Sequence, residues 1–452
     1  MKSDNKVSDT VSVLLKLINR IQARYSVLSG VVLGKGIIAL ADQGVVSAAN
    51  FSTGLIIGRI CSKEQFGLYV LGFTILMFII NVQSCLISIP YTIYSPHLQG
   101  VDLNRYTGST LLHQLVLSFL IIIILAITGA VLSLGFGPPG LAPVVKTLMF
   151  VSSFILLWDY ARRLSFATLK MKNALLLDSC VLVLQVGLVL ILGKLGYLSA
   201  ARAYWVIGTA CGVVTLSWLF LNKKNFKLSF KQAISDLLQN LSTGLWILGS
   251  GLLWGASNYL YPWLLVAFHG AALTAAWAAC QGVVALCNPL FMGLQNSFTP
   301  QIAHVYATGK IDALRRFALH AIAIMGLTIL PFCLILVVFG GHLVLGFYGS
   351  KYSGNGLIVS ILAVNLLVSS LAFAPSRALF TVERVDVDFK INIVSLVLLF
   401  SCGIPFVKRF GLAGAAAGLL LSNSASLVLL LIAFSRIGRS RKTYKTADRG
   451  DG

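Results

Sequence analysis

Charged side chains are scarce in this sequence, and acidic ones are the scarcest. Only 11% of the 452 residues are Asp, Glu, Lys or Arg, and 14 of them are acidic, whereas soluble domains carry roughly 25% charged residues. Hydrophobic residues make up 57% of the chain, and the mean hydropathy is +0.88. A folded soluble domain needs a polar exterior, so this composition excludes a soluble enzyme and a secreted disulfide-stabilised domain. It predicts a protein whose solvent is lipid.

Sequence motifs for nucleotide, metal and redox chemistry are also missing. The chain has no Gly-rich phosphate-binding loop of the Walker type, so we expect no ATP hydrolysis. Its eight cysteines show no CxxC pairing and no ligand spacing with the histidines, which favours small buried hydrophobic side chains. The sequence therefore predicts a protein that is not an enzyme and that holds no cofactor or metal.

Continuous apolar runs recur along the chain, and each is close to the roughly 20 residues needed to cross a bilayer. They predict about twelve membrane-spanning helices, at residues 36–58, 67–92, 108–134, 142–165, 174–193, 199–221, 241–268, 271–298, 317–340, 355–380, 390–407 and 411–434. Strands that cross a membrane would show short alternating segments instead. The predicted fold class is an all-α polytopic membrane protein.

A sequence repeat divides the predicted spans into two halves. The residues Pro90, Asp102 and Arg105 recur 210 positions later as Pro300, Asp312 and Arg315. Together with six spans in each half, this repeat predicts two pseudo-symmetric six-helix lobes, related by an axis along the membrane normal. The predicted parts are a cytoplasmic amphipathic segment at 1–35, a first lobe at 36–221, a cytoplasmic inter-lobe loop at 222–240, a second lobe at 241–434 and a basic cytoplasmic tail at 435–452.

Lysine and arginine are distributed unevenly between the two sides of the predicted membrane. Of the 35 cationic residues, 26 fall on the side that holds both termini and 8 on the other side. The positive-inside rule then predicts that both termini are cytoplasmic. Membrane insertion and attraction to anionic membrane lipid account for the net charge of +21, so no nucleic-acid partner is predicted.

The few ionisable residues inside spans are the candidates for function, because each costs about 2.5–3.5 kcal/mol at the centre of a membrane helix. Asp42 shares a sector of about 100° with Ala49, Asn50 and Thr53, which forms a polar stripe on the first span. Asp42 has no cation at i+3 or i+4. We expect it to receive a proton or to pair with a cation from another span.

Other charged residues have a structural interpretation beside the functional one. Asp159 can pair locally with Arg162 or Arg163 at i+3 and i+4, and Asp178 lies near an interface where it can snorkel. Arg59, at the outer end of the first span, keeps its charge at any working pH. The predicted transport residues are Asp42, Asn50, Arg59 and Asp159.

The start of the first lobe resembles a known family. Residues 41–72 run from Ala-Asp-Gln-Gly-Val-Val-Ser-Ala-Ala-Asn-Phe through Gly58-Arg59 to Phe66-Gly67-Leu68-Tyr69. They resemble polysaccharide-transporter (O-antigen-flippase-like) members of the multidrug/oligosaccharidyl-lipid/polysaccharide exporter superfamily. The small-residue run at 411–416 is similar to the start of that family's last helix.

The resemblance implies that the chain flips a polyprenyl-pyrophosphate-linked oligosaccharide across a bacterial inner membrane by alternating access, with a proton or sodium gradient as a candidate driving force. Glycan polymerases and glycosyltransferases of the same pathway are the implied partners. Two alternatives stay open: a cation-coupled multidrug exporter of the same superfamily, and a membrane-embedded glycan polymerase or transferase. The very short outer loops argue against the second alternative.

Overall fold

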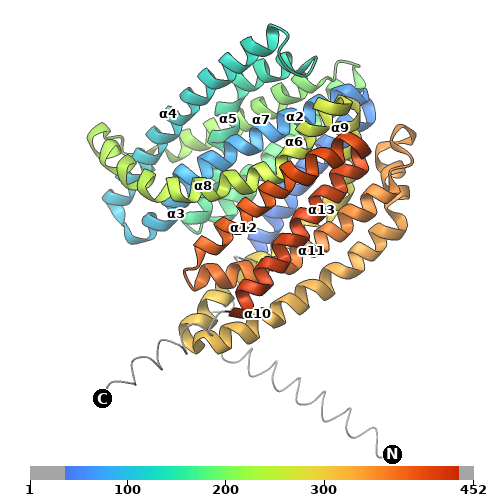
Figure 1. The fold of residues 1–452 in the computed structure, drawn as a ribbon. Coiled ribbons are helices and arrows are strands. Elements are labelled where there is room, and N and C mark those ends of the chain that lie inside the picture. The colour runs from blue at the N-terminus through green and yellow to red at the C-terminus, as the bar shows by residue number, and fades with distance from the viewer. Residues whose placement is uncertain (1–35, 437–452) are drawn as a thin grey trace, which may run out of the picture.

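The protein is described by a computed structural model over residues 36–436, and every regular element in that part of the chain is helical (Figure 1). The predicted segments 1–35 and 437–452 lie outside the described residues. The elements are a helix over 36–60, α2 (Lys63–Gln83), η1 (Ser84–Ser88), α3 (Ile89–Tyr94), η2 (Ser95–His97), α4 (Gly100–Ser133), α5 (Leu141–Ala167), α6 (Met171–Lys194), α7 (Ala200–Asn222), η3 (Lys223–Asn225), α8 (Phe230–His269), α9 (Ala271–Val284), η4 (Ala285–Cys287), α10 (Asn288–Tyr348), η5 (Ser350–Tyr352), α11 (Gly356–Thr381), α12 (Val385–Leu398), η6 (Leu399–Gly403) and α13 (Ile404–Arg436).

Two of these helical elements contain a reversal of chain direction. In α10 the rings of Phe298 and Phe317 lie 6.2 Å apart, although 19 residues of straight helix would separate them by about 28 Å. In α13 the backbone at Gly411 leaves helical geometry, with φ 55° and ψ −122°. A positive φ of this size favours glycine. Each element therefore joins the end of one membrane crossing to the start of the next.

The predicted fold class is confirmed. Nine stretches of the described chain are long and apolar enough to cross a membrane. One of these, Asp386–Arg436, holds two crossings because of the reversal at Gly411. Together with the helix over 36–60 and α8, these stretches account for the twelve membrane crossings that the sequence predicts.

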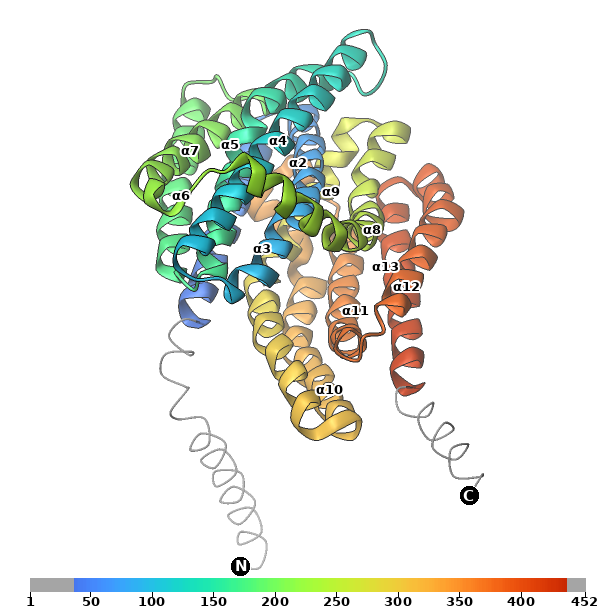
Figure 2. The same cartoon turned by 90° about the vertical axis from the view of Figure 1, so that its left-hand side faces the viewer.

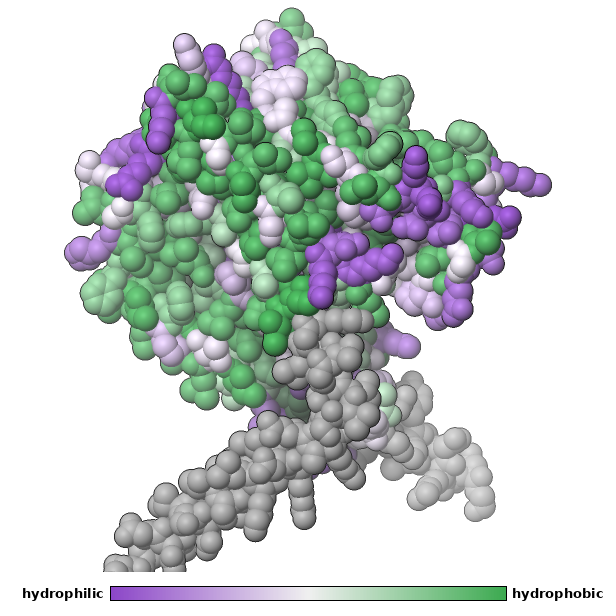
Figure 3. All heavy atoms as spheres, turned by 180° about the vertical axis from the view of Figure 1, so that it is seen from behind, coloured by the Kyte–Doolittle hydropathy of each residue, from purple (hydrophilic) through white to green (hydrophobic). Residues whose placement is uncertain are grey.

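The surface matches a lipid environment. Seen from behind, the hydrophilic side chains gather toward opposite ends of the molecule and a broad hydrophobic band lies between them (Figure 3). Large apolar side chains such as Phe119, Val183 and Leu327 are 62–72% exposed. Exposed apolar area on this scale is unusual for a soluble monomer and is expected where lipid is the solvent.

Two helical bundles stand side by side, the first built from the chain up to α7 and the second from α8 onward (Figure 2). The interval 222–240, predicted as the loop between them, is helical from Phe230. The start of α8 is ordered by α4: Lys227 donates its backbone N–H to the Asn104 carbonyl at 3.0 Å, and a ring nitrogen of His113 lies 2.7 Å from the Ala233 carbonyl. The helix therefore begins earlier than its apolar stretch because α4 packs against it.

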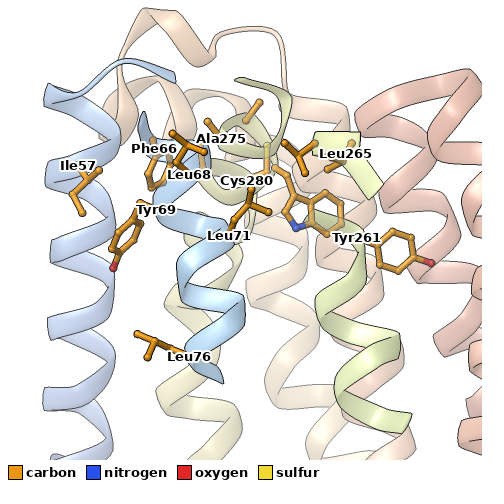
Figure 4. Packing of buried hydrophobic residues seen from close by; sticks show 14 of the residues in the cluster. Ile57, Phe66, Leu68, Tyr69, Leu71, Leu76, Tyr261, Leu265, Ala275 and Cys280 are labelled. Carbon is orange, nitrogen blue, oxygen red and sulfur yellow. The ribbon is translucent and has the colours of Figure 1, made fainter. Parts of the chain in front are cut away.

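The two bundles share one hydrophobic core near the end of the molecule where residues 58–72 lie. Side chains of the helix over 36–60 and of α2 meet those of α8 and α9 (Figure 4). Phe66 stacks on Tyr348 with the ring centroids 5.9 Å apart. Gly67 faces the backbone of Ala271 so closely that a Cβ there would overlap the Ala271 carbonyl. This close approach joins the lobes at what topology predicts to be the outer end.

The first prediction concerns orientation. Single cysteines that replace the exposed residues Lys224 and Asp312 should resist an impermeant thiol reagent in intact cells, whereas a cysteine that replaces Lys194 should react. Permeabilised cells, in which all three should react, provide the control for accessibility. Labelling of the Lys224 and Asp312 variants in intact cells would reverse the orientation.

The second prediction concerns the contact between the lobes. Gly67→Ala should lower the melting temperature of the purified protein in detergent, because the added methyl group overlaps the Ala271 carbonyl and forces α2 away from α9. Gly187→Ala is the matched control: it lies within α6 and its Cβ would meet nothing within 4 Å, so the change should be neutral or stabilising. Equal melting temperatures for the two variants would contradict this account of the interface.

Candidate functional site

The helix over 36–60 carries one fully buried carboxylate, Asp42, and this residue is paired with a cation from another span. Its Oδ2 accepts a hydrogen bond from Nη2 of Arg162 at 2.7 Å. Arg162 lies on α5, 120 positions further along the chain. The expectation that Asp42 pairs outside its own helix therefore agrees with the geometry. Its Oδ1 is buried with no hydrogen-bond partner in the described part of the chain.

Arg162 binds a second carboxylate at the same time. Its Nε donates to Oδ2 of Asp178 at 2.6 Å, and Trp158 donates its indole N–H to Oδ1 of Asp178 at 2.9 Å. Trp158 and Arg162 are four residues apart and so project from one face of α5. We call Asp42, Trp158, Arg162 and Asp178 the arginine cluster.

The arginine cluster sits out of contact with bulk water. The Asp42 and Asp178 side chains are 0% and 1% exposed, and that of Arg162 is 14% exposed. With both carboxylates ionised, one guanidinium faces two negative charges. The prediction that Asp178 snorkels at an interface is wrong, because its side chain turns into the bundle and binds Arg162.

A second polar contact joins the same helices further along the membrane normal. Gln185 of α6 donates its Nε2 to Oγ1 of Thr53 at 2.8 Å, and both residues are buried. Thr53 lies about 16 Å beyond Asp42 along its helix, and Gln185 lies about 10 Å beyond Asp178. The helix over 36–60 is thus joined to α6 at two levels, through Arg162 between Asp42 and Asp178 and directly between Thr53 and Gln185. We call these two levels together the polar seam.

The other predicted site residues lie apart from the arginine cluster. Asn50 is exposed although Asp42 and Thr53, which share its predicted stripe, are buried. Asp159 pairs with Arg163 at 2.6 Å within α5, as its i+4 spacing allows. Arg59 is exposed near the C-terminal end of its helix, where its backbone carbonyl accepts a hydrogen bond from Nζ of Lys351.

Lys351 gathers cationic charge around Arg59. Its Nζ also donates to the Cys61 carbonyl at 2.6 Å, and both Lys351 and Lys63 lie over the ring of Tyr352. Burial lowers the pKa of the Lys351 ammonium group, and the nearby charge of Lys63 acts in the same direction. Arg59 therefore stands in a region of positive charge at the place where the two lobes meet.

Near the end of its fourth span the second lobe has an arginine, as the first lobe has Arg162. Arg377 follows it by 215 residues and lies between two aromatic rings, 5.6 Å from the centroid of Phe373 and 5.1 Å from that of Phe380. Among the residues that the structure describes, no carboxylate lies within salt-bridge distance of Arg377. Arg162 also lies over a phenylalanine of its own helix, 5.3 Å from the centroid of Phe166. The two arginines thus share an aromatic neighbour, and among the described residues they differ in the carboxylates that Arg162 binds.

Four members of the site are absent from the predicted transport residues: Trp158, Arg162, Asp178 and Gln185. The sequence predicts Arg162 as a local partner of Asp159 and Asp178 as a snorkelling residue, and it gives no role to Trp158 or Gln185. The i, i+4 pair of Trp158 and Arg162 is visible in the sequence, as is the seven-residue spacing of Asp178 and Gln185. Neither spacing says which helix lies opposite, so the partners could not be assigned without the packing.

Comparison with known proteins agrees with this architecture. A model of the family described as "polysaccharide biosynthesis protein" matches residues 32–306. The probable flippase AglR from Haloferax volcanii is 26% identical over 183 residues, which is 39% of this chain and 38% of that protein. The chain thus matches about two fifths of the length of this relative.

Solved structures with the same fold are transporters. An inward-facing conformation of a multidrug resistance MATE family transporter of the MOP superfamily is similar over 90% of this chain and 99% of its own, with a TM-score of 0.74 and 18% identity. A MOP superfamily transporter from Pyrococcus furiosus, described as having a binding pocket of reverse polarity, gives a TM-score of 0.66 with 16% identity, over 90% of this chain and 96% of its own. At identities of 16–18%, these structural similarities establish the fold alone.

The third prediction tests the arginine cluster. Arg162→Ala should destabilise the protein by about 3–5 kcal/mol, because it leaves buried carboxylates without their cation. Asp42→Asn should cost much less, since the amide can still accept from Arg162 and the Arg162–Asp178 pair stays balanced. Thermal unfolding in detergent measures both changes.

A matched control for Arg162→Ala is Arg105→Ala, which removes the same side chain from an ion pair at the surface. That arginine is 53% exposed and lies 3.6 Å from Asp102, so its loss should cost about 0–1 kcal/mol. If Arg162→Ala and Arg105→Ala unfold at the same temperature, the buried cluster does not stabilise the first lobe.

Proposed function

Because the chain belongs to the polysaccharide biosynthesis protein family, we propose that it is a flippase that moves a polyprenyl-pyrophosphate-linked oligosaccharide across a membrane by alternating access. One observation carries this proposal: the family match covers the whole of the first lobe, including every residue of the arginine cluster and of the polar seam. The multi-pass helical fold and the similarity to a probable flippase support it.

The packing between the lobes supports alternating access. The lobes touch around Gly67 and Ala271, and the helix over 36–60 also contacts the second lobe through Phe51 and Phe347, whose rings lie 5.5 Å apart. Opening toward the outer side requires these contacts to part. Further contacts run along α8, where the Gly251 carbonyl accepts from Asn81 at 2.9 Å and Asn240 accepts from Tyr106 at 2.8 Å. In this proposal the two bundles move against each other as nearly rigid units.

We propose that the arginine cluster couples this movement to an ion gradient. Two carboxylates beside one guanidinium leave one negative charge uncompensated, and the cost of such a charge in lipid favours uptake of a proton or a sodium ion. Uptake at Asp42 weakens its bond to Arg162. The hydrogen bond between Thr53 and Gln185 then remains as a polar contact between the helix over 36–60 and α6, and the opposite face of this helix, which touches the second lobe, is free to shift.

The remaining predicted site residues receive roles in substrate handling within this proposal. Arg59, with Lys351 and Lys63 beside it, supplies fixed positive charge for the pyrophosphate at the outer end. Asn50 is exposed and offers an amide for sugar hydroxyl groups. Asp159 keeps the orientation of Arg163 through their 2.6 Å pair.

The alternative within the superfamily is a cation-coupled exporter of cationic drugs. Such a protein needs carboxylates that can face its substrate. In the first lobe Asp42, Asp159 and Asp178 each accept from an arginine, which favours an anionic substrate over a cationic one. For the flippase we infer a bacterial inner membrane with both chain ends in the cytoplasm, beside the glycosyltransferases and the polymerase that supply and consume its substrate.

The fourth prediction tests the substrate and the coupling together. Reconstituted vesicles should transfer a polyprenyl-pyrophosphate-linked oligosaccharide between leaflets without ATP, and an imposed proton or sodium gradient should accelerate the transfer. Asp42→Asn should reduce gradient-driven transfer at least tenfold while membrane abundance stays near normal. Transfer is measured by the access of an added glycan-modifying enzyme to the outer leaflet.

Asp102→Asn is the matched control, because it makes the same chemical change at a carboxylate that is 70% exposed. It should transfer substrate at the normal rate. Vesicles that accumulate a fluorescent cationic drug and ignore the lipid-linked oligosaccharide would favour the exporter. If the Asp42→Asn protein is depleted from the membrane and each surviving molecule works normally, Asp42 stabilises the fold without taking part in transport.

A further inference from the structure

A cavity of about 470 Å³ opens at the inner end of the second lobe. Its walls come from the ends of four spans: the turn within α10, the end of α11, the start of α12 and the end of α13. Most of the lining is apolar, including Leu379, Val394, Leu429 and Ile432. The volume lies within the range of about 300–1,000 Å³ that is typical of ligand sites.

The rim of this cavity carries positive charge. Arg384, Lys390 and Arg436 line it together with one carboxylate, Asp386. Asp386 is 3.1 Å from Arg384 and 3.6 Å from Lys390, so it offsets only part of the charge and the rim stays net positive. An apolar interior below a cationic rim matches a molecule with an anionic head and a hydrocarbon chain.

A smaller cavity in the first lobe provides a comparison within the same molecule. The related place in the first lobe is lined by Leu164, Thr168, Trp218 and Asn222, which precede Leu379, Val382, Ala433 and Arg436 of the large cavity by 214 or 215 residues. It holds only about 80 Å³. The small cavity is also much more polar, with four asparagines in its lining.

Two of these paired positions explain the difference. Trp218 fills the first-lobe site and packs edge-on against Phe226, with ring centroids 6.2 Å apart, whereas its counterpart Ala433 leaves that volume open. Asn222 is neutral, whereas its counterpart Arg436 adds a cation at the rim. The cavity of the second lobe is therefore more open, and three cations line it where one, Lys170, lines the small cavity.

We propose that the cavity of the second lobe binds an anionic phospholipid of the inner leaflet, with the phosphate at Arg384, Lys390 and Arg436 and an acyl chain along the apolar wall. Basic pockets between spanning helices on the cytoplasmic side suit such headgroups. The bound lipid fills the volume that Trp218 fills in the first lobe and so supports the ends of α11 to α13. This binding is independent of the transported substrate.

The experiment uses the full-length purified protein and phosphatidylglycerol as the probe, with bound lipid counted by native mass spectrometry and stability followed by the melting temperature. The unaltered protein should carry phosphatidylglycerol and should melt at a higher temperature when it is added, because the lipid binds only the folded state. Ala433→Trp, which introduces the residue of the first lobe, and Arg436→Asn should each reduce the bound lipid at least fivefold. Both should also abolish the rise in melting temperature.

Lys231→Gln is the matched control, since it removes an exposed cation from the start of α8, away from the cavity. It should bind phosphatidylglycerol normally. Equal loss in the Lys231→Gln and Arg436→Asn variants would overturn the proposal in favour of diffuse surface attraction. It would also be overturned by equal binding of phosphatidylcholine, or by complete displacement by inorganic phosphate. If Ala433→Trp does not fold, Arg436→Asn decides the outcome alone.

Discussion

The bond between Arg162 and two buried carboxylates is the interaction on which the first lobe depends. Lipid offers no water to solvate Asp42 or Asp178, so each must find a cation inside the protein. One guanidinium serves both, at 2.7 and 2.6 Å. The helix over 36–60, α5 and α6 therefore meet at a single point, and any change of charge at that point alters the packing of all three helices.

That arrangement also sets the relation between the lobes. The helix over 36–60 turns Asp42 toward Arg162 of α5 and Thr53 toward Gln185 of α6. The face with Phe51 and Gly58 is left for Phe347 and Tyr348 of the second lobe. The two faces belong to one rigid helix. In the proposed mechanism, a proton or cation received on one face changes the contact on the other without any long chain of intermediate residues.

The two lobes share a plan and differ in chemistry. Arg162 and Arg377 each lie near the end of the fourth span of their lobe, yet the first binds carboxylates while the second lies between Phe373 and Phe380. At the inner end, Trp218 closes a site that Ala433 leaves open. In a duplicated architecture the backbone arrangement is common to both halves, because both must satisfy their hydrogen bonds in lipid. The side chains that face the interior can diverge, and they carry the separate functions.

Apolar runs were sufficient to predict the spans, because the length and polarity of a membrane helix are local properties of the sequence. The pairing of Asp159 with Arg163 was within reach for the same reason, as one turn of helix separates them. The bond between Asp42 and Arg162 and the burial of Asp178 could not be predicted from the sequence, because they depend on which faces of three distant helices meet. The early start of α8 likewise follows from contact with α4, which no local pattern records.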